Sequence, residues 1–413
     1  MKNRINKYFS SLLTPSIKMY TWQGLVKTVC IHLSLFGLLP YSVKFLKTKQ
    51  LYRAIPKSFY FNVLYATIII CVINCFIVIH LRHIVLYSKS NIMTDAIMTQ
   101  MNYMVEVLML IICADISYTT SFINCGAFVN IFNKIITTWN ELPIVGSGKI
   151  IKNNILRKLD TRMKVVYLAS LLSLSMETYI NCIRNDDLWK MLLVSLSDVS
   201  AEIVHFTAIS FYSILIMMVT SLLENIEKSL LEFVKIVSRN NSNDIWKVGS
   251  RSAVTTLSPI ERNYVKVFEI KREVQKIFET LLLFTSLQSF HSIVSETYFL
   301  YHGITQKTFT IHEIISCTNW LVYQLNKIIM MSYAGSLLKA NNFKIAQVLY
   351  KISIENKDTK FFMEVQHFST LMSYQDTDLS VFGYFSIDAT FLFSVMSSTA
   401  MYVIILVQFD NTT

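Results

Sequence analysis

Long apolar runs recur along this 413-residue chain, and they restrict its fold more than any other feature. A helix needs about 20 apolar residues to cross a bilayer core of about 30 Å. Hydrophobic residues make up 53% of the chain and the mean hydropathy is +0.44, which excludes a soluble globular balance. The sequence therefore predicts an all-α membrane protein with seven transmembrane helices. The predicted spans are 60–85, 99–125, 164–184, 195–222, 279–304, 312–336 and 381–409.

An eighth apolar segment lies near the start of the chain. It is LVKTVCIHLSLFGLLPYSV at 25–43, and it contains Lys27, His32 and the helix-breaking Pro40. Charge and a late proline disfavour a spanning helix. We therefore interpret 25–43 as a helix that lies on, or dips into, the inner leaflet, with an eighth span as the alternative.

Lysine and arginine are distributed unevenly between the predicted spans. Four segments, 1–58, 126–163, 223–278 and 337–380, hold 31 of these residues, whereas the three short connections hold three. Cytoplasmic segments retain Lys and Arg, so we expect the N-terminus to be cytoplasmic and the C-terminus extracellular, opposite to a G-protein-coupled receptor. The net charge of +11 then reflects topology, and we expect no nucleic-acid partner.

The longer connections contain helical patterns of their own. Apolar residues recur every three to four positions in 222–237, 267–278 and 343–354, which predicts amphipathic helices in a cytoplasmic anchor region. Such helices can pack on one another within a chain or also between subunits. The stretch 238–261 is rich in Ser, Asn and Gly, and predicts a mobile linker.

Ionisable side chains lie inside the predicted spans, where a central charge costs about 2.5–3.5 kcal/mol. Several acids fall in the outer halves of their helices, at the same depth as aromatic and amide side chains. Polar groups backed by aromatic rings suit a hydroxylated or nitrogenous ligand, so these residues could line one cavity. The alternative is that each acid is protonated or hydrogen-bonded at a helix contact. The set comprises Tyr103, Glu106, Glu177, Tyr179, Asp198, Glu202, Glu296, Tyr298, Asn319, Trp320 and Tyr323.

The last predicted span carries a polar stripe. Its residues follow at steps of four, three, four and three, which places them on one helix face. Small hydroxyls below a glutamine suit a narrow wet pore closed by apolar side chains. The alternative is a polar seam against neighbouring helices. The stripe is Ser394, Ser398, Met401, Ile405 and Gln408, with Phe409 beside its outer end.

Motifs of catalytic chemistry are missing from the sequence. It contains no glycine-rich phosphate loop, zinc motif or nucleophile elbow, and its seven cysteines show no metal-ligand spacing. We therefore expect no enzyme activity, no cofactor and no metal.

The stretch MYVIILVQF at 401–409 resembles the terminal signature of insect gustatory receptors, in which a Thr-Tyr pair and five aliphatic residues precede Gln-Phe. The preceding GYFSIDATFLFS and the N-terminal FGLLPYS segment are similar to the same family, as is the plan of about 400 residues and seven spans. Met401 departs from the pattern, because it stands where the family usually has threonine and removes a hydroxyl from the pore face.

The resemblance implies a tetrameric, ligand-gated, non-selective cation channel related to the insect olfactory receptors. Each subunit of a homotetramer or heterotetramer contributes its last helix to a central pore for Na⁺, K⁺ and Ca²⁺. The gate residues implied by the motif are Ile405, Gln408 and Phe409. The implied ligand site lies among spans two to six towards the outside, in the plasma membrane of a chemosensory neuron.

The implied ligand is a small-molecule tastant. Val403 stands where the main sugar-receptor branch of the family usually has Glu, so we favour a bitter or plant-derived compound. A fructose-type sugar receptor is the alternative within the family. A polytopic secondary transporter is the alternative from another class, although no inverted repeat is visible.

These expectations divide the chain into four parts. Residues 1–59 form a cytoplasmic segment with the membrane-surface helix. Residues 60–336 form a six-helix ligand-binding region, with cytoplasmic helical extensions at 223–278. Residues 337–380 form a cytoplasmic anchor helix, and 381–413 form the pore-lining seventh helix with a short extracellular tail.

Overall fold

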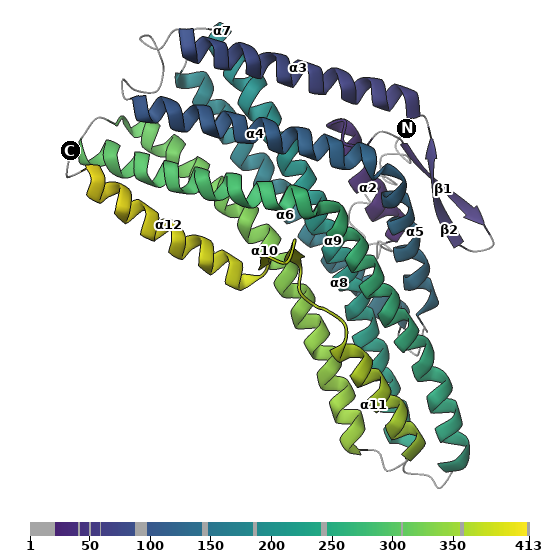
Figure 1. Cartoon of the computed structure of the whole chain (residues 1–413). Helices are drawn as coiled ribbons and strands as arrows, with labels where there is room; N and C mark the ends of the chain where they lie inside the picture. Colours follow the sequence, from purple (N-terminus) through teal and green to yellow (C-terminus); the bar gives the residue numbers. More distant parts are fainter. Residues whose placement is uncertain are drawn as a thin grey trace, which may run out of the picture.

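The described part of the chain is a bundle of long helices with two small β-hairpins (Figure 1). In this computed structural model the described residues are 21–39, 42–48, 51–57, 59–86, 97–142, 148–184, 188–240, 246–306, 309–355 and 359–410. The helices are α2 (Trp22–Leu35), α3 (Phe59–Leu86), α4 (Ile97–Ile123), α5 (Cys125–Glu141), α6 (Gly148–Arg184), α7 (Leu188–Val194), the π-helix η2 (Ser195–Val199), α8 (Ser200–Asn240), α9 (Trp246–Thr305), α10 (Ile311–Glu355), α11 (Thr359–Ser373) and α12 (Ala389–Asp410). The hairpins are β1 (Ser42–Thr48) with β2 (Leu51–Lys57), and β3 (Ser380–Val381) with β4 (Phe385–Ser386), both antiparallel.

Helix α2 is shorter and more enclosed than the predicted surface helix at 25–43. It ends at Leu35 because Gly37 takes a φ of 71°, and the amide of Leu38 then donates to the carbonyl of Leu33 across 2.9 Å. One face of α2 is buried against the bundle, including Val26 with 0% of its surface exposed. The chain continues into β1 before it reaches α3, so the last two residues of the predicted segment, 42–43, are strand.

Helix α8 is the central element of the bundle. Every residue from 204 to 227 is buried, and the helix contacts α4, α5, α6, α9 and α10. Apolar residues on all sides suit a helix that is covered by protein all round. The predicted span at 195–222 is therefore helical but begins with the π-helix η2, which precedes α8.

Helices α9 and α10 extend well beyond the apolar part of the bundle, and α11 packs beside them at the lower end of Figure 1. Helix α9 already begins at Trp246, so most of the linker predicted at 238–261 is helix. Burial of Leu257 and Ile260 against the bundle overrides the weak helix propensity of the Ser-rich and Gly-containing sequence. The anchor predicted as one helix at 337–380 is instead the end of α10 and the separate α11.

Local sequence fixes the start of α10. The amide of Thr310 donates to Glu313 Oε2 across 2.8 Å, and the amide of Glu313 donates back to Thr310 Oγ1 across 3.4 Å. This reciprocal pair is a capping box, which gives partners to backbone amides that an uncapped helix N-terminus would leave without hydrogen bonds.

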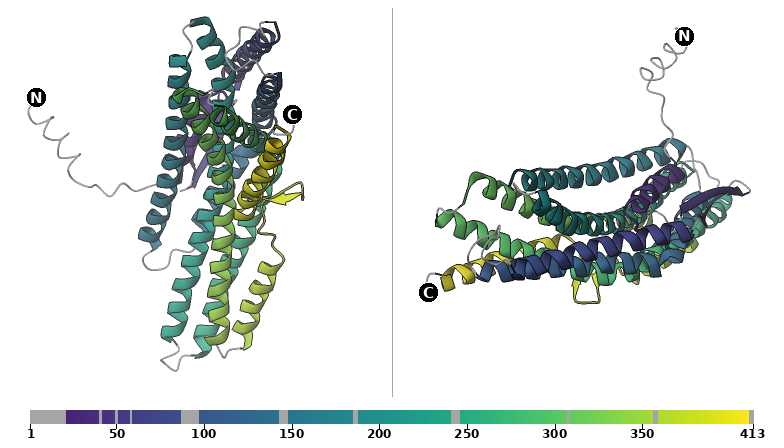
Figure 2. Two further views of the ribbon diagram at one scale, coloured as in Figure 1. Left: turned by 90° about the vertical axis from the view of Figure 1, so that its left-hand side faces the viewer. Right: turned by 90° about the horizontal axis from the view of Figure 1, so that it is seen from above.

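Helix α12 begins eight residues after the start of the predicted span at 381–409. The β3–β4 hairpin occupies the intervening segment and stands out from the bundle in Figure 2. Its turn places Phe382 at a φ of 48° and Gly383 at a φ of 74°, and neither conformation continues a helix. Asp388 then caps α12 by accepting from the amide of Thr390 across 2.8 Å.

Each of the seven predicted spans lies wholly or largely on helix in the described part of the chain. Five segments there are both long and apolar enough to cross a membrane: Tyr60–His83, Met101–Ile123, Met191–Lys235, Leu257–Thr305 and Ala389–Gln408. The spans predicted at 164–184 and 312–336 lie within the helices α6 and α10. The protein is thus nearly all-helical, with several helices suited to a membrane.

Candidate functional site

Four helices bring a buried polar network together inside the bundle. Lys327 of α10 donates to Glu202 of α8 across 2.6 Å and to Gln288 of α9 across 2.8 Å. Both charged side chains have 0% of their surface exposed. Gln324 also donates to Glu202, and His205 lies 3.4 Å from its other oxygen. An ion pair this deep is tolerated because each of its charged groups also makes a hydrogen bond to an amide side chain, Gln288 or Gln324.

A second carboxylate lies beside this network. Glu106 of α4 accepts from Ser292 Oγ of α9 across 2.5 Å and from the indole of Trp320 of α10 across 2.8 Å. The Trp320 ring stacks on the ring of Tyr323 with centroids 5.6 Å apart, and Lys327 Nζ lies 5.3 Å from the Tyr323 centroid. Glu106 is half-buried, unlike the enclosed carboxylate of Glu202.

A third cluster surrounds Asp198, where η2 interrupts the helical pattern. Tyr103 of α4 donates to Asp198 Oδ2 across 2.6 Å, and Ser197 donates to Oδ1 across 3.1 Å. His80 of α3 lies 3.5 Å from Oδ1 and 2.7 Å from the Ser197 hydroxyl. Single π-turns are found often at functional sites, and here the turn carries Asp198 toward α3 and α4.

The structure brings together six of the eleven residues predicted for the ligand site. Glu106, Glu202, Trp320 and Tyr323 belong to the connected network of α4, α8, α9 and α10, and Tyr103 with Asp198 forms the adjacent cluster. Tyr179 is apart from them, with 66% of its surface exposed. The side chain of Glu177 lies outside the described residues. Half-buried positions on α9 and α10 hold Glu296, Tyr298 and Asn319.

Sequence reasoning missed the central basic residue. Lys327 interrupts the apolar run of the span predicted at 312–336, and that interruption was a usable signal, because an intramembrane lysine needs a partner. Gln288 and Ser292 gave no comparable signal, since amides and hydroxyls are common at helix contacts.

The stripe of α12 is largely exposed in the single chain. Met401 and Ile405 are 61% and 39% exposed, Ser394 and Gln408 are also exposed, and Ser398 is half-buried. The side chain of Phe409 lies outside the described residues. On the opposite face, Val395 and Thr399 are each 7% exposed. The stripe is therefore not the side by which α12 packs on its own bundle.

A polar clamp holds the base of α12. Lys339 of α10 donates to Asp388 across 2.5 Å and lies 2.8 Å from Asp378. Partial burial raises the pKa of Asp388, but the bonds from Lys339 and Thr390 outweigh this effect and hold it at about 2. The hydrogen bond from Lys339 also lowers the pKa of Asp378. From α9, Gln275 Nε2 donates to the carbonyl of Ser380 across 2.7 Å.

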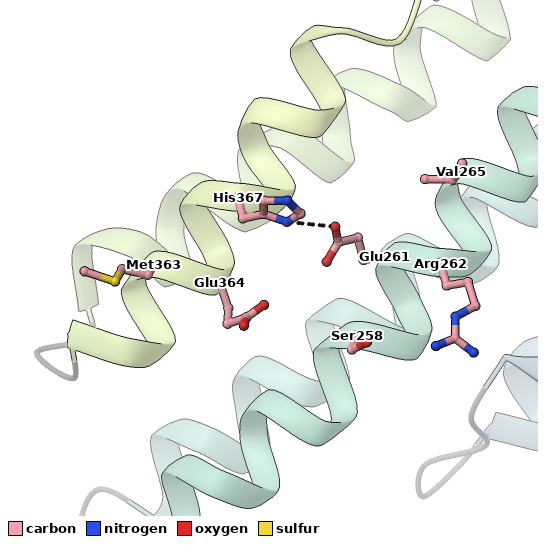
Figure 3. A pocket seen from close by; sticks show the side chains of 7 residues that line it. All are labelled: Ser258, Glu261, Arg262, Val265, Met363, Glu364 and His367. Carbon is pink, nitrogen blue, oxygen red and sulfur yellow. Dashed lines mark ion pairs between the residues drawn. The ribbon is translucent and has the colours of Figure 1, made fainter.

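A separate groove of about 580 Å³ lies between α9 and α11 (Figure 3). None of its lining residues belongs to the polar network or to the clamp at the base of α12. His367 of α11 points toward Glu261 of α9, and their ring nitrogen and carboxylate oxygen are 2.9 Å apart. Arg262 and Glu364 also line it. Within the described part of the chain, no three His, Cys, Asp or Glu side chains are placed to share a metal ion, here or elsewhere.

The bundle of long apolar helices around a buried polar network is consistent with a membrane protein. A model of the 7tm chemosensory receptor family matches residues 26–413, so the chain belongs to that family, which is not a family of enzymes. This finding confirms the resemblance seen in the sequence.

Comparison with known proteins gives relatives and a shared fold. Gustatory and pheromone receptor 32a of Drosophila melanogaster is 24% identical over 37% of this chain, and gustatory receptor 68a is 29% identical over 32%. The matched part spans only about a third of each relative, 33% and 34%. The solved insect olfactory receptor OR5 from Machilis hrabei superposes with a TM-score of 0.69, over 94% of this chain and 98% of that one, at 14% identity. The same receptor has been solved in complex with eugenol.

Proposed function

We propose that this chain is a subunit of a tastant-gated, non-selective cation channel with seven spans, a cytoplasmic N-terminus and an extracellular C-terminus. The observation that carries the proposal is the exposed stripe of α12. Hydrocarbon is a poor environment for Ser394 and Ser398, whereas four copies of the helix around one axis would turn these hydroxyls toward a shared wet pore. Membership of the chemosensory receptor family supports this arrangement.

In the proposed channel, Ile405, Gln408 and Phe409 form the outer gate, and the stripe below them lines the pore. The polar network of α4, α8, α9 and α10 contributes the ligand site, because two of these helices, α9 and α10, also contact α12. We assign the channel to the plasma membrane of chemosensory neurons, as a homotetramer or with related subunits. A bitter or plant-derived tastant is the favoured ligand, with a fructose-type sugar as the second candidate.

The test is to express the full chain in cells without other taste receptors and to record membrane current during a panel of bitter compounds and sugars. A non-selective cation channel gives a ligand-dependent current. This current reverses near 0 mV when Na⁺ is the cation on one side of the membrane and K⁺, at equal concentration, is the cation on the other. The stripe variant Ile405→Lys, expressed at the same surface level, is the control, and its ligand-dependent current should be lost. Stoichiometric uptake of a tested compound without such current would instead identify a transporter.

A further inference from the structure

We infer that the activating ligand is a cationic amine, whose ammonium group pairs with Glu106. This inference rests on the proposed function and names the ligand class for the same site. The inference follows from a difference between three buried or half-buried carboxylates of the bundle, Glu106, Asp198 and Glu202. They differ in whether both of their oxygens have a partner within the chain.

Two of the carboxylates are fully engaged by their own chain. In Glu202, one oxygen accepts from Lys327 and Gln324, and the other lies against His205. In Asp198, one oxygen accepts from Tyr103 and the other from Ser197. Every oxygen of these two groups thus already has a partner within the chain.

Glu106 is different, because its hydrogen bonds are all made by one oxygen. Ser292 and Trp320 both donate to Oε1, and no hydrogen bond from a described residue reaches Oε2. Among the described residues no Lys or Arg pairs with Glu106, and the lysine nearest in the network, Lys327, is already paired with Glu202. A carboxylate in a membrane bundle is stabilised by a cation, and here a bound ligand can supply it.

The surroundings of Glu106 also suit an ammonium group. The stacked rings of Trp320 and Tyr323 offer aromatic surface next to the carboxylate, and aromatic faces attract cations. An independent observation is that the hydroxyl of Tyr323 and Nε2 of Gln288 are buried without a hydrogen-bond partner, each residue being only 1% exposed. Buried polar atoms in proteins nearly always have partners, so a polar ligand atom or a water completes this site.

Other charged groups face the same place. His291 of α9 is near enough to act electrostatically on Glu106, and so is Glu202 of α8. The carboxylate of Glu202 adds negative potential, while His291 carries a positive charge only when protonated. A ligand that brings its own permanent charge does not depend on that protonation, which makes quaternary ammonium compounds the sharpest probes.

The experiment compares isosteric pairs on the full chain in cells. Benzyltrimethylammonium is compared with neopentylbenzene, and choline with 3,3-dimethylbutan-1-ol, since each pair differs only in charge. We expect current from at least one cation and none from its neutral isostere. Glu106→Gln should raise the half-activating concentration about tenfold to a hundredfold, as expected for loss of the ionic attraction between the carboxylate and a partly desolvated cation.

Asp115→Asn is the matched control. Asp115 lies on the same helix and accepts from Asn74 at 3.1 Å through one oxygen, but it is not part of the network around Trp320. Its removal should leave the half-activating concentration within about twofold of the unsubstituted chain.

Three results would overturn the inference: equal responses to a cation and its isostere, no response to either pair at millimolar concentration, or an unchanged half-activating concentration in Glu106→Gln. The last result would mean that Glu106 is already neutral and acts as a packing group. Failure of the proposed function is recognised separately, because Ile405→Ala should then carry no leak current despite normal surface expression.

Discussion

Gly335 of α10 lies against the carbonyl oxygen of Ile387, one residue before the cap of α12. A Cβ added at Gly335 would stand 1.9 Å from that oxygen, far inside any permitted contact. The close approach of α10 to the base of the last helix therefore depends on the absence of a side chain at this position.

Gly335→Ala is expected to destabilise the protein by about 1–3 kcal/mol, because the base of α12 must move to admit a methyl group. Thermal unfolding of the purified protein in detergent measures the effect. Gly126→Ala is the control, since a Cβ there would meet nothing within 4 Å and alanine favours helix. Equal melting temperatures for the two variants would contradict the contact.

Lys327→Met should be strongly destabilising, by about 3–5 kcal/mol, because it leaves Glu202 buried without its cation. Surface expression and thermal unfolding report the loss. Adding Glu202→Leu should recover part of it, since removing both charges costs less than removing one. A double variant no more stable than Lys327→Met would show that the pair is not coupled.

The clamp at Lys339 should make stability sensitive to acid. Asp388 has a folded pKa of about 2 against an ordinary 3.8, so its contribution is complete above about pH 4 and is lost as the pH falls toward 2. In Lys339→Met, the melting temperature at pH 6 should be lower, and it should fall less between pH 4 and pH 2 than in the unsubstituted protein. Parallel pH profiles for the two proteins would rule out this contribution.

Substitutions on the stripe of α12 should change gating and permeation separately. Ile405→Ala should leak current without ligand, because the apolar closure is weakened. Gln408→Glu should favour divalent cations and Gln408→Lys should suppress cation current, each effect being repeated in four subunits. Basal current and reversal potentials measure both. Unaltered values in all three variants, at normal surface expression, would place the stripe against another helix.

The proposed topology predicts that Asn240 carries no glycan, although Asn240-Asn241-Ser242 is an acceptor sequence. It lies in the connection with ten Lys and Arg residues, which is expected to be cytoplasmic. Treatment with a glycosidase should leave the electrophoretic mobility unchanged. A shift that disappears in Asn240→Gln would reverse the assigned sides.

The sequence predicted most helices because apolar runs and 3.6-residue periodicity are properties of one segment at a time. It placed the start of the last span at residue 381 because Phe385 and Ile387 are apolar, whereas the turn at Gly383 delays the helix to Ala389. The anchor was predicted as helical, but not its division into α10 and α11.

The candidate site was foreseen in part for a similar reason. Glu106 and Trp320 were singled out as polar or aromatic residues at one depth, and they proved to be hydrogen-bonded. The partner of Glu202 was not predicted. Its pairing with Lys327 joins residues 125 positions apart and depends on how α8 and α10 are arranged. Residue type reveals that a buried charge needs a partner, but only the packed helices decide which one.

Helices α9 and α10 each run without a break from the level of Glu106 to the base of α12. On α9, Ser292 and Gln275 are 17 positions apart, or about 26 Å at 1.5 Å per residue. On α10, Trp320 and Lys339 are 19 positions apart, or about 29 Å. Each helix thus contacts the carboxylate of Glu106 through the first of these residues and the base of α12 through the second. A small displacement or tilt of either helix at Glu106 must therefore reach the base of α12, since an unbroken helix has no hinge in which to absorb it.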